Sequence, residues 1–304
     1  MQYTKDFSVI VPVWRGAIRF LPKLIDSIPD KEEIEIIVVD NSLDPVKREE
    51  IDCLRDFVFF HSEHCRHAGG SRNDGMLVAK GKWLLFADAD DYFTPNAFDI
   101  FYSKFFSDAE IVYTGMKGVY SDTGTPSDRG DIYTQKVHKY CSGLADEIIL
   151  RIGFASPCCK MVSHELVNRY ELRYDEIRAG NDVYFSLATG ILANAIDAVD
   201  SVTYIATVNR GSLTMRRDYE VIRARYCAVL HCNQFMKEHG YGKYQSSVMY
   251  YLVESRRFGI KKMFIFLSML INYRQNPFIG YKNWVKTFWH NRKVNKINED
   301  YIVR

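Results

Sequence analysis

The chain has 304 residues, of which 47% are hydrophobic and 26% are charged. These values are ordinary for a globular protein and exclude a collagen-like, a disordered or a disulfide-scaffold chain. The net charge of +2 hides an asymmetry, because Ser255–Arg304 holds 11 of the 40 basic residues and 2 of the 38 acidic ones. A basic end on an acidic body indicates an anionic partner, either a membrane surface or a nucleic acid.

No segment of the sequence predicts insertion into a membrane. Residues Met1–Asp6 lack the apolar core of a signal peptide, and the longest apolar run, Met263–Ile271, is too short to span a bilayer. The seven cysteines include no Cys-x-x-Cys pair, which favours a reducing compartment. We therefore expect a cytoplasmic protein, free or peripheral on the cytoplasmic face of the inner membrane.

Apolar strands and helical patterns alternate over the first hundred residues. Strands are expected at Phe7–Val13, Ile34–Val39, Phe57–Phe60 and Lys82–Ala87, and helices at Ile18–Ile28, at Gly69–Lys80 and from Thr94–Pro95 to Phe106. This alternation predicts an α/β fold with a right-handed, mostly parallel sheet. In such sheets, ligands bind beyond the carboxyl ends of the strands.

The second half of the chain has a looser pattern. Short strands are expected at Ile111–Tyr113, Gly118–Tyr120, Asp131–Tyr133 and Val202–Val208, and helices at Leu144–Ile152 and Asp182–Ala193. From about Arg216 the pattern is helical throughout. The sequence therefore predicts an α/β domain over residues 1–215 and a basic, amphipathic helical region over residues 216–304.

Carboxylates follow the strand that ends at Ala87. If that strand stays extended, Asp88 and Asp90 point to the same face, which is costly in an apolar strand unless a cation compensates. Oxygen ligands favour Mg²⁺ or Mn²⁺. The alternative is that these aspartates cap the next helix, but Thr94 and Pro95 already provide an N-cap and a first-turn proline.

Four segments taken together resemble the family 2 glycosyltransferases of the GT-A fold, of the bacterial cell-surface polysaccharide type. They are Phe7–Val13, Ile36–Ser42, Gly70–Gly75 and Ala79–Asp91, in the family's order. The resemblance implies a metal-dependent, inverting hexosyl- or N-acetylhexosaminyl-transferase. Its donor would be a nucleotide diphosphate sugar, a UDP-sugar for preference, and its acceptor a glycan or lipid-linked hydroxyl.

The same resemblance assigns a donor site. It implies nucleotide contacts by Pro12, Val13, Trp14, Asp40, Arg72, Asp88 and Ala89, and a Mn²⁺ or Mg²⁺ ion on Asp90. Asp40 would hydrogen-bond a uracil N–H, although Asp-Asn-Ser is also an ordinary Asx turn. Arg72 would lie near the base, or else be a solvated helix arginine. Where the family often has two aspartates, this chain has Asp40 and Asn41, which leaves the base preference open.

A later acidic position resembles the family's general base. Asn181 stands where the family usually has glutamate, and Asp182 takes the place of the base that accepts the acceptor's proton. Either residue could instead cap the helix that follows. The resemblance further implies diphosphate or acceptor contacts by Lys160 and Arg210.

The basic end predicts a separate contact. Lysines and arginines interleave with Tyr281, Trp284, Phe288 and Trp289 at helical spacing, a pattern typical of membrane interfaces. The alternative is an ordinary helix packed on the protein. Nucleic acid is the poorer match because the body is acidic and carries no recognition motif.

Two other functions are open besides glycosyl transfer. One is a nucleotidyltransferase that makes nucleotide sugars, although the glycine-rich, lysine-bearing signature expected after its first strand is absent from the sequence. The other is a catalytically silent nucleotide-sugar-binding protein, against which the Asp88–Asp90 motif and Asp182 argue.

Overall fold

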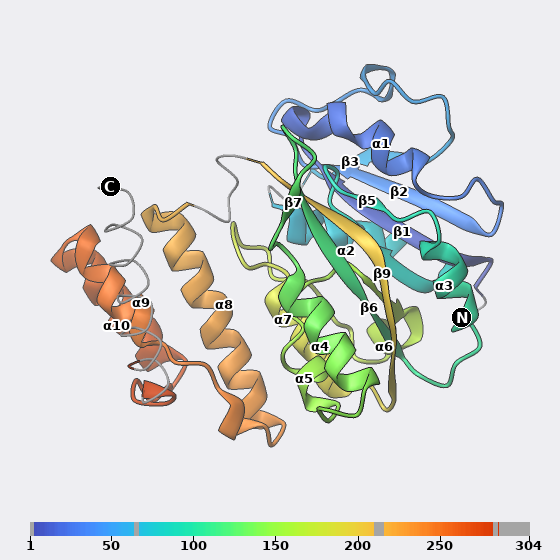
Figure 1. The fold of residues 1–304 in the computed structure, drawn as a ribbon. Helices are drawn as coiled ribbons and strands as arrows, with labels where there is room; N and C mark the ends of the chain where they lie inside the picture. The colour runs from blue at the N-terminus through green and yellow to red at the C-terminus, as the bar shows by residue number, and fades with distance from the viewer. Residues whose placement is uncertain (1–2, 64–66, 210–215, 282–284, 286–304) are drawn as a thin grey trace, which may run out of the picture. The chain divides into compact units, whose positions relative to one another are not determined.

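The computed structural model of the chain describes residues 3–63, 67–209, 216–281 and 285. The chain divides into two compact units, Met1–Met215 and Arg216–Arg304 (Figure 1). The boundary lies where the sequence pattern becomes helical throughout.

The first unit is built on one mixed sheet, with nine strands among the described residues. The order is β3-β2-β1-β4-β8-β6-β9-β5, and β7 pairs with β6. The strands are β1 (Lys5–Val13), β2 (Ile34–Asp40), β3 (Val58–His61), β4 (Gly81–Phe86), β5 (Tyr92–Phe93), β6 (Ile111–Tyr120), β7 (Pro126–Ser127), β8 (Lys160–Ser163) and β9 (Ile196–Val208). The first four strands along the chain pair in parallel, as predicted, whereas β8 runs antiparallel to both β4 and β6.

Helices cover both faces of this sheet (Figure 1). The α-helices of the unit are α1 (Leu21–Asp26), α2 (Ala68–Val78), α3 (Ala97–Ser103), α4 (Asp131–Cys141), α5 (Ile148–Arg151), α6 (His164–Arg169) and α7 (Val183–Leu192), with 3-10 turns at η1 (Arg15–Phe20) and η2 (Arg48–Glu50). Phe7 of β1 packs edge-on against Phe98 of α3. Ile10 points to the opposite face, where α2 approaches so closely that a Cβ on Gly75 would lie 2.5 Å from the Ile10 side chain.

Several sequence expectations for local structure were wrong. Asp131–Tyr133 is the first turn of α4, which starts after Gly130 in a left-handed conformation (φ +93°) and so is not a strand. Leu144–Ile152 yields only the short helix α5. The helix after Thr94 begins at Ala97, with Asn96 at the N-cap position, because the Thr94 hydroxyl donates to the Val202 carbonyl of β9 at 3.0 Å.

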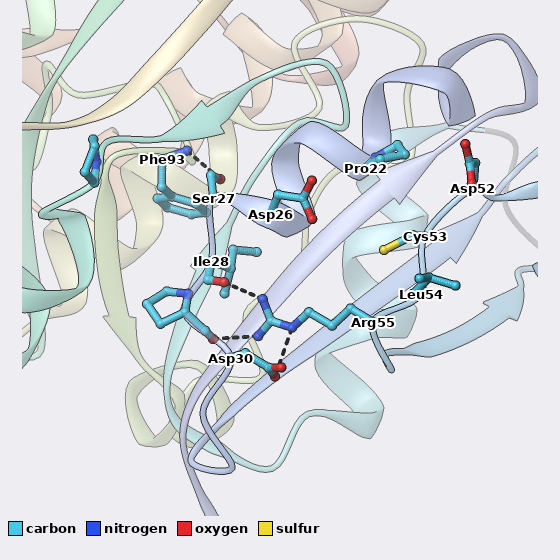
Figure 2. Close-up of a pocket in the computed structure, with 12 residues that line it drawn as sticks. Pro22, Asp26, Ser27, Ile28, Asp30, Asp52, Cys53, Leu54, Arg55 and Phe93 are labelled. Atoms are coloured by element: carbon cyan, nitrogen blue, oxygen red, sulfur yellow. Dashed lines mark hydrogen bonds and ion pairs between the residues drawn. The ribbon is translucent and has the colours of Figure 1, made fainter.

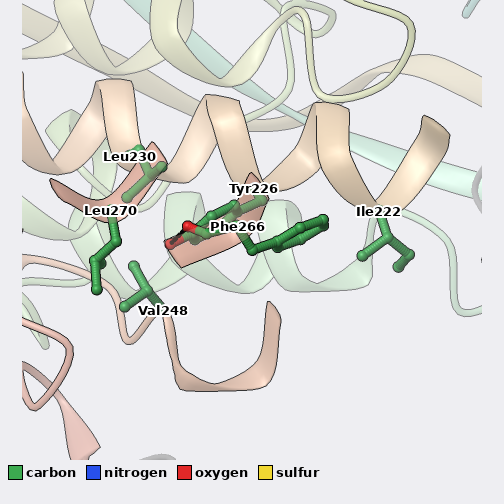
Figure 3. Close-up of a cluster of buried hydrophobic side chains, with 6 residues drawn as sticks. All are labelled: Ile222, Tyr226, Leu230, Val248, Phe266 and Leu270. Atoms are coloured by element: carbon green, nitrogen blue, oxygen red, sulfur yellow. Dashed lines mark hydrogen bonds between the residues drawn. The ribbon is translucent and has the colours of Figure 1, made fainter. Parts of the chain in front are cut away.

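The second unit is helical throughout its described part. It contains α8 (Tyr219–Glu238), η4 (Gly242–Tyr244), α9 (Met249–Ser255), η5 (Arg256–Phe258) and α10 (Ile260–Asn272). Its core consists of six buried side chains, Ile222, Tyr226, Leu230, Val248, Phe266 and Leu270 (Figure 3). Three of them recur every four residues along α8, which gives that helix one apolar face. Within the described ranges, no helix is both long and apolar enough to cross a bilayer.

Candidate active site

Three neighbouring strands end in register at one edge of the parallel half of the sheet. Val13 at the end of β1 pairs with Asp40 at the end of β2, and Asp40 pairs with His61 at the end of β3. Side chains paired in register on adjacent strands point to the same face of a sheet. Val13, Asp40 and His61 therefore form one row at the carboxyl ends of three parallel strands. In α/β folds, ligands bind beyond these strand ends.

The Asp40 carboxylate is buried and fully engaged by the chain itself. Its Oδ1 accepts bonds from the amide and hydroxyl of Ser42, and its Oδ2 accepts bonds from the Val46 amide and His61 Nδ1, both at 2.9 Å. Burial raises the pKa of Asp40, but these hydrogen bonds outweigh that effect and leave the pKa below its usual value. The Asx turn is present, and the expected uracil contact finds no open acceptor on this carboxylate, which has about four lone-pair sites.

The loop after β1 presents one large aromatic ring. Pro12 and Val13 are buried, whereas Trp14 is 62% exposed. The indole lies over the backbone at Gly16, where a Cβ would meet a ring carbon at 2.1 Å. Of the three residues expected at the base, Trp14 is thus the one whose side chain offers a stacking surface.

The predicted Asp-x-Asp motif forms a tight turn. The strand does not extend to Asp90, as one expectation required. Instead β4 ends at Phe86, and the Asp91 amide donates to the Asp88 carbonyl at 3.0 Å. Burial and the Asp88 charge raise the pKa of Asp90. Asp91 is 2% exposed, and burial together with both neighbouring carboxylates raises its pKa well above the usual value. Ala89 is buried between them.

Arg72 joins this acidic turn to the predicted catalytic segment. Its Nη2 donates to Asp88 Oδ1 at 2.6 Å and its Nη1 donates to Asn181 Oδ1 at 3.0 Å. The guanidinium also lies over the Tyr174 ring, 5.3 Å from its centroid. Arg72 is 4% exposed, so the interpretation as a solvated helix arginine was wrong. Two parts of the chain more than 90 residues apart therefore meet on one side chain.

Asp182 occupies the N-cap position of α7 but does not cap the helix. Its side chain makes no capping hydrogen bond, and the Asn181 oxygen that could have capped the helix is bound by Arg72. Burial raises the pKa of Asp182, while the nearby Arg72 charge lowers it by less. A carboxylate held without a capping partner, with a raised pKa, has the properties of a general base.

Two polar residues at the acidic turn were missed by the site assignment. Asn209 Nδ2 donates to Asp90 Oδ2 at 2.7 Å. Burial lowers the pKa of the Arg129 guanidinium, but the charges of Asp91, Asp88 and Asp90 together outweigh burial and raise it. Arg129 follows β7, and its guanidinium also donates to the Thr207 carbonyl of β9. Nothing in the local sequence marks this arginine, because the β6–β7 hairpin and β9 together place it.

Lys160 is buried at the start of β8. It is 1% exposed, and no partner accepts a bond from its Nζ among the described residues. The nearest rings are those of Phe154 and Tyr113, at 5.6 and 5.8 Å. Burial lowers its pKa to about 8, partly offset by the nearby Cys159 and Asp182. The Lys160 ammonium is thus near enough to Asp182 for the two charges to interact. Arg210 lies outside the described residues.

A large cavity elsewhere in the unit contains none of these residues. It measures about 950 Å³ and lies between α1 and the loop 52–55 (Figure 2). Arg55 fills one side, where its guanidinium binds the carbonyls of Ile25, Ile28 and Pro29 and the carboxylate of Asp30. These bonds satisfy carbonyls at the end of α1, so we assign Arg55 a structural role.

Comparisons with known proteins find a family model and several relatives of this chain. The family model described as "Glycosyl transferase family 2" matches residues 8–171. The UDP-Glc:alpha-D-GlcNAc-diphosphoundecaprenol beta-1,3-glucosyltransferase WfaP of Escherichia coli is 28% identical over 202 residues, which cover 63% of this chain and 72% of WfaP. The poly(ribitol-phosphate) beta-glucosyltransferase of Bacillus spizizenii is 25% identical over 215 residues, 67% of this chain and 32% of that longer protein.

A solved structure shares the fold. The crystal structure of S. aureus TarS 1–349 in complex with UDP-GlcNAc superposes with a TM-score of 0.61 at 21% sequence identity. The superposition covers 88% of this chain and 80% of that chain. At this level of identity the likeness establishes the architecture, so the α/β fold with a helical C-terminal region is confirmed.

Proposed function

Because the chain belongs to glycosyl transferase family 2, we propose that it transfers a hexosyl or N-acetylhexosaminyl group from a UDP-sugar to a hydroxyl of a glycan or lipid-linked acceptor. The family model covers more than half of the chain. The match covers 72% of WfaP, and the name of WfaP specifies a UDP-Glc donor and a diphosphoundecaprenol-linked acceptor. These names support a role in surface polysaccharide synthesis.

One observation in the structure carries this proposal. Arg72 bonds both Asp88 of the acidic turn and Asn181, the neighbour of Asp182. A transferase needs its leaving-group site and its base on opposite sides of one reacting carbon. An arginine that bonds both segments supports such an arrangement.

The proposed step is a single displacement. The Asp182 carboxylate takes the proton of the acceptor hydroxyl while that oxygen attacks the anomeric carbon. The bond between that carbon and the diphosphate oxygen breaks, and its electron pair leaves with the nucleoside diphosphate. Attack from the face opposite the leaving group inverts the anomeric centre. The raised pKa of Asp182 matches this task, because a stronger base takes the proton more readily.

The acidic turn fits a divalent cation. Asp88, Asp90 and Asp91 crowd three carboxyl groups into one turn near the guanidiniums of Arg72 and Arg129, and burial and mutual repulsion raise the pKa of Asp90 and Asp91, a repulsion that a bound cation would relieve. Asp90 offers the oxygen ligands that Mn²⁺ and Mg²⁺ prefer, with the remaining positions open to diphosphate. The described residues contain no preformed group of three or more ligating side chains. We therefore propose that Asp90 holds the ion together with the donor, and that the ion when bound neutralises charge on the leaving diphosphate.

We also propose that the second unit contacts an anionic membrane surface, on the cytoplasmic face where a lipid-linked acceptor would be used. Most of Tyr281–Trp289 lies outside the described residues, so the support comes from α10. Its residues Ile260, Phe264, Leu267 and Ile271 form one stripe and are 60%, 60%, 36% and 73% exposed. The helix contains two lysines and no carboxylate, and Arg256 and Lys261 are exposed beside the stripe.

The test of the transferase function is donor turnover. A panel of UDP-, GDP-, CDP- and dTDP-sugars is incubated with the protein and Mn²⁺ or Mg²⁺, and release of the nucleoside diphosphate is measured with and without lipid-linked acceptors. We expect release from at least one UDP-sugar, greatly reduced in Asp182→Asn. Binding of donors with no turnover under any condition would indicate a silent binding protein. Release of pyrophosphate from a nucleoside triphosphate and a sugar phosphate would indicate a nucleotidyltransferase.

A further inference from the structure

Asp40 and His61 form a hydrogen-bonded pair whose two members differ in exposure. His61 Nδ1 lies 2.9 Å from Asp40 Oδ2, and the two side chains are 28% and 0% exposed. The other acceptor positions of the carboxylate are taken by Ser42 and Val46. A ligand at this edge of the sheet can therefore touch the imidazole, but it cannot touch the carboxylate.

The pair also determines which imidazole nitrogen is an acceptor. The pKa of Asp40 lies below its usual value, so the carboxylate is ionised at neutral pH and can only accept. His61 Nδ1 must then carry the hydrogen of their bond. In a neutral imidazole with Nδ1 protonated, Nε2 has a free lone pair and accepts. From the sequence pattern alone His61 is a polar residue after a strand, because only the register of β2 and β3 places it beside Asp40.

We propose that His61 reads the donor's nucleobase through Nε2, and that Asp40 is a positioning residue that holds the imidazole in the accepting tautomer. This inference rests on the proposed nucleotide-sugar function. An acceptor at this point matches the ring N–H of uracil. Cytosine carries a lone pair on the same ring nitrogen and meets the acceptor with repulsion, so the pair selects uridine over cytidine nucleotides.

The position of His61 suits such a contact. His61 lies in register with Asp40 and Val13, two strands away from β1. Neighbouring strands lie about 4.8 Å apart, so His61 is about 10 Å from the end of β1. Trp14, the exposed ring at that end, would stack on the base while His61 meets its edge. A nucleobase with its ribose is large enough to span that gap.

The experiment compares UDP and CDP binding by calorimetry in the full chain with Mn²⁺. The central variant is His61→Asn, because the asparagine amide can keep the bond to Asp40 while Nε2 is deleted. His61→Ala is the second variant. The matched control is His138→Asn, which alters another His–Asp pair of the same unit, with His138 Nδ1 2.8 Å from Asp200 Oδ2 on the surface.

We expect wild type and His138→Asn to prefer UDP by tenfold or more. His61→Asn and His61→Ala should weaken UDP binding about 3- to 10-fold, as loss of one hydrogen bond predicts. The ratio of the UDP and CDP affinities should then be close to one. Asp40→Asn, if folded by circular dichroism, should lower the same ratio. If His61→Asn retains UDP preference, the inference is wrong. A ratio lost in Asp40→Asn alone would mean that Asp40 reads the base directly. Absence of any nucleotide binding by wild type would refute the proposed function, and this inference with it.

Discussion

Arg72 Nη2 and Asp88 Oδ1 lie 2.6 Å apart, in a pair that is almost closed to solvent on the arginine side. Burial lowers the pKa of Arg72, but the charge of Asp88 together with the nearby Tyr174 and Asp182 more than offsets this and keeps the guanidinium charged. A buried ion pair tolerates removal of one partner poorly, because the other charge is then left without compensation. The pair is therefore both a structural link between α2 and the acidic turn and a fixed positive charge beside the proposed diphosphate site.

The two hydrogen bonds of the Arg72 guanidinium predict that even a conservative substitution will strongly reduce the transfer rate. Arg72→Lys keeps the charge, but one ammonium cannot replace two parallel N–H donors aimed at Asp88 and Asn181. We expect transfer to fall by about 10-fold or more with the fold intact. The control is Arg169→Lys, which changes a less buried pair with Glu110. Equal transfer rates in Arg72→Lys and the control would show that the two guanidinium hydrogen bonds do not help to position the site.

Metal dependence is checked by thermal shift. UDP should raise the melting temperature when Mn²⁺ or Mg²⁺ is present and have little effect in EDTA, because Asp90 and the diphosphate are proposed to share the ion. Asp90→Asn should remove most of the metal-dependent shift. Asp108→Asn changes an exposed aspartate outside the site and serves as the control. A full shift by UDP in EDTA would contradict the metal assignment.

Asp182→Asn should separate catalysis from stability. Loss of a general base costs about 10²- to 10⁴-fold in rate, whereas UDP binding should be retained. The folded-state pKa of Asp182 is raised, so the folded state binds a proton more tightly than the unfolded chain does. The charged form therefore costs stability at neutral pH, and that cost vanishes as the pH falls below the unfolded value.

Two measurements check this sign. The variant should melt at a higher temperature than wild type at pH 7, and the difference should shrink toward pH 4. Wild-type kcat/KM should fall on acidification from a higher pH than an ordinary aspartate would give. Near-normal turnover by Asp182→Asn would send the search for the base to Asp175 or Glu176.

The sequence predicted the parallel half of the sheet well because each strand there is a continuous apolar run. Ile34–Val39 and Lys82–Ala87 were placed within a residue or two of β2 and β4. Short segments failed for a physical reason. A triplet such as Asp131–Tyr133 has too few residues to show a period, and the left-handed Gly130 that starts α4 is visible only in the backbone.

The family resemblance predicted the acidic turn and Asp182, but it did not predict the side-chain contacts that hold them in place. Arg129 and His61 reach the site through strand pairing, which sequence spacing does not encode. The Asp40 side chain is buried because Val46 and His61 close over it from two other segments. Direct base contact by Asp40 stays a prediction, and the bonds that engage both of its oxygens could not be predicted from its strand-end position.

Lys160→Met should stabilise the folded protein. Burial lowers the folded-state pKa of Lys160 to about 8, so between pH 8 and the unfolded value near 10.5 the unfolded chain binds more protons. The free energy of unfolding therefore rises with pH across that window. Below pH 8 the buried ammonium is charged in the folded state and lowers the free energy of unfolding. Wild type should approach Lys160→Met in melting temperature as the pH rises from 7 to 10. A lower melting temperature of the variant at pH 7 would show that the ammonium is compensated in the folded state.

The exposed stripe of α10 predicts binding to vesicles through both apolar contact and charge. Phe264→Glu combined with Ile271→Glu places carboxylates on the exposed face and leaves the buried Phe266 and Leu270 unchanged. We expect weaker co-sedimentation with phosphatidylglycerol vesicles. The control is Leu144→Glu, an exposed leucine of the first unit, which should not alter binding.

Salt separates the two contributions to vesicle binding. Raising ionic strength from 0.05 to 0.5 M shortens the Debye length from about 14 to about 4 Å and should weaken wild-type binding only in part, because burial of the apolar stripe does not depend on salt. Complete release would mean that charge alone holds the protein on the surface. If wild type ignores anionic vesicles even at low salt, the stripe serves another partner, and sedimentation of the full chain would show whether that partner is a second copy.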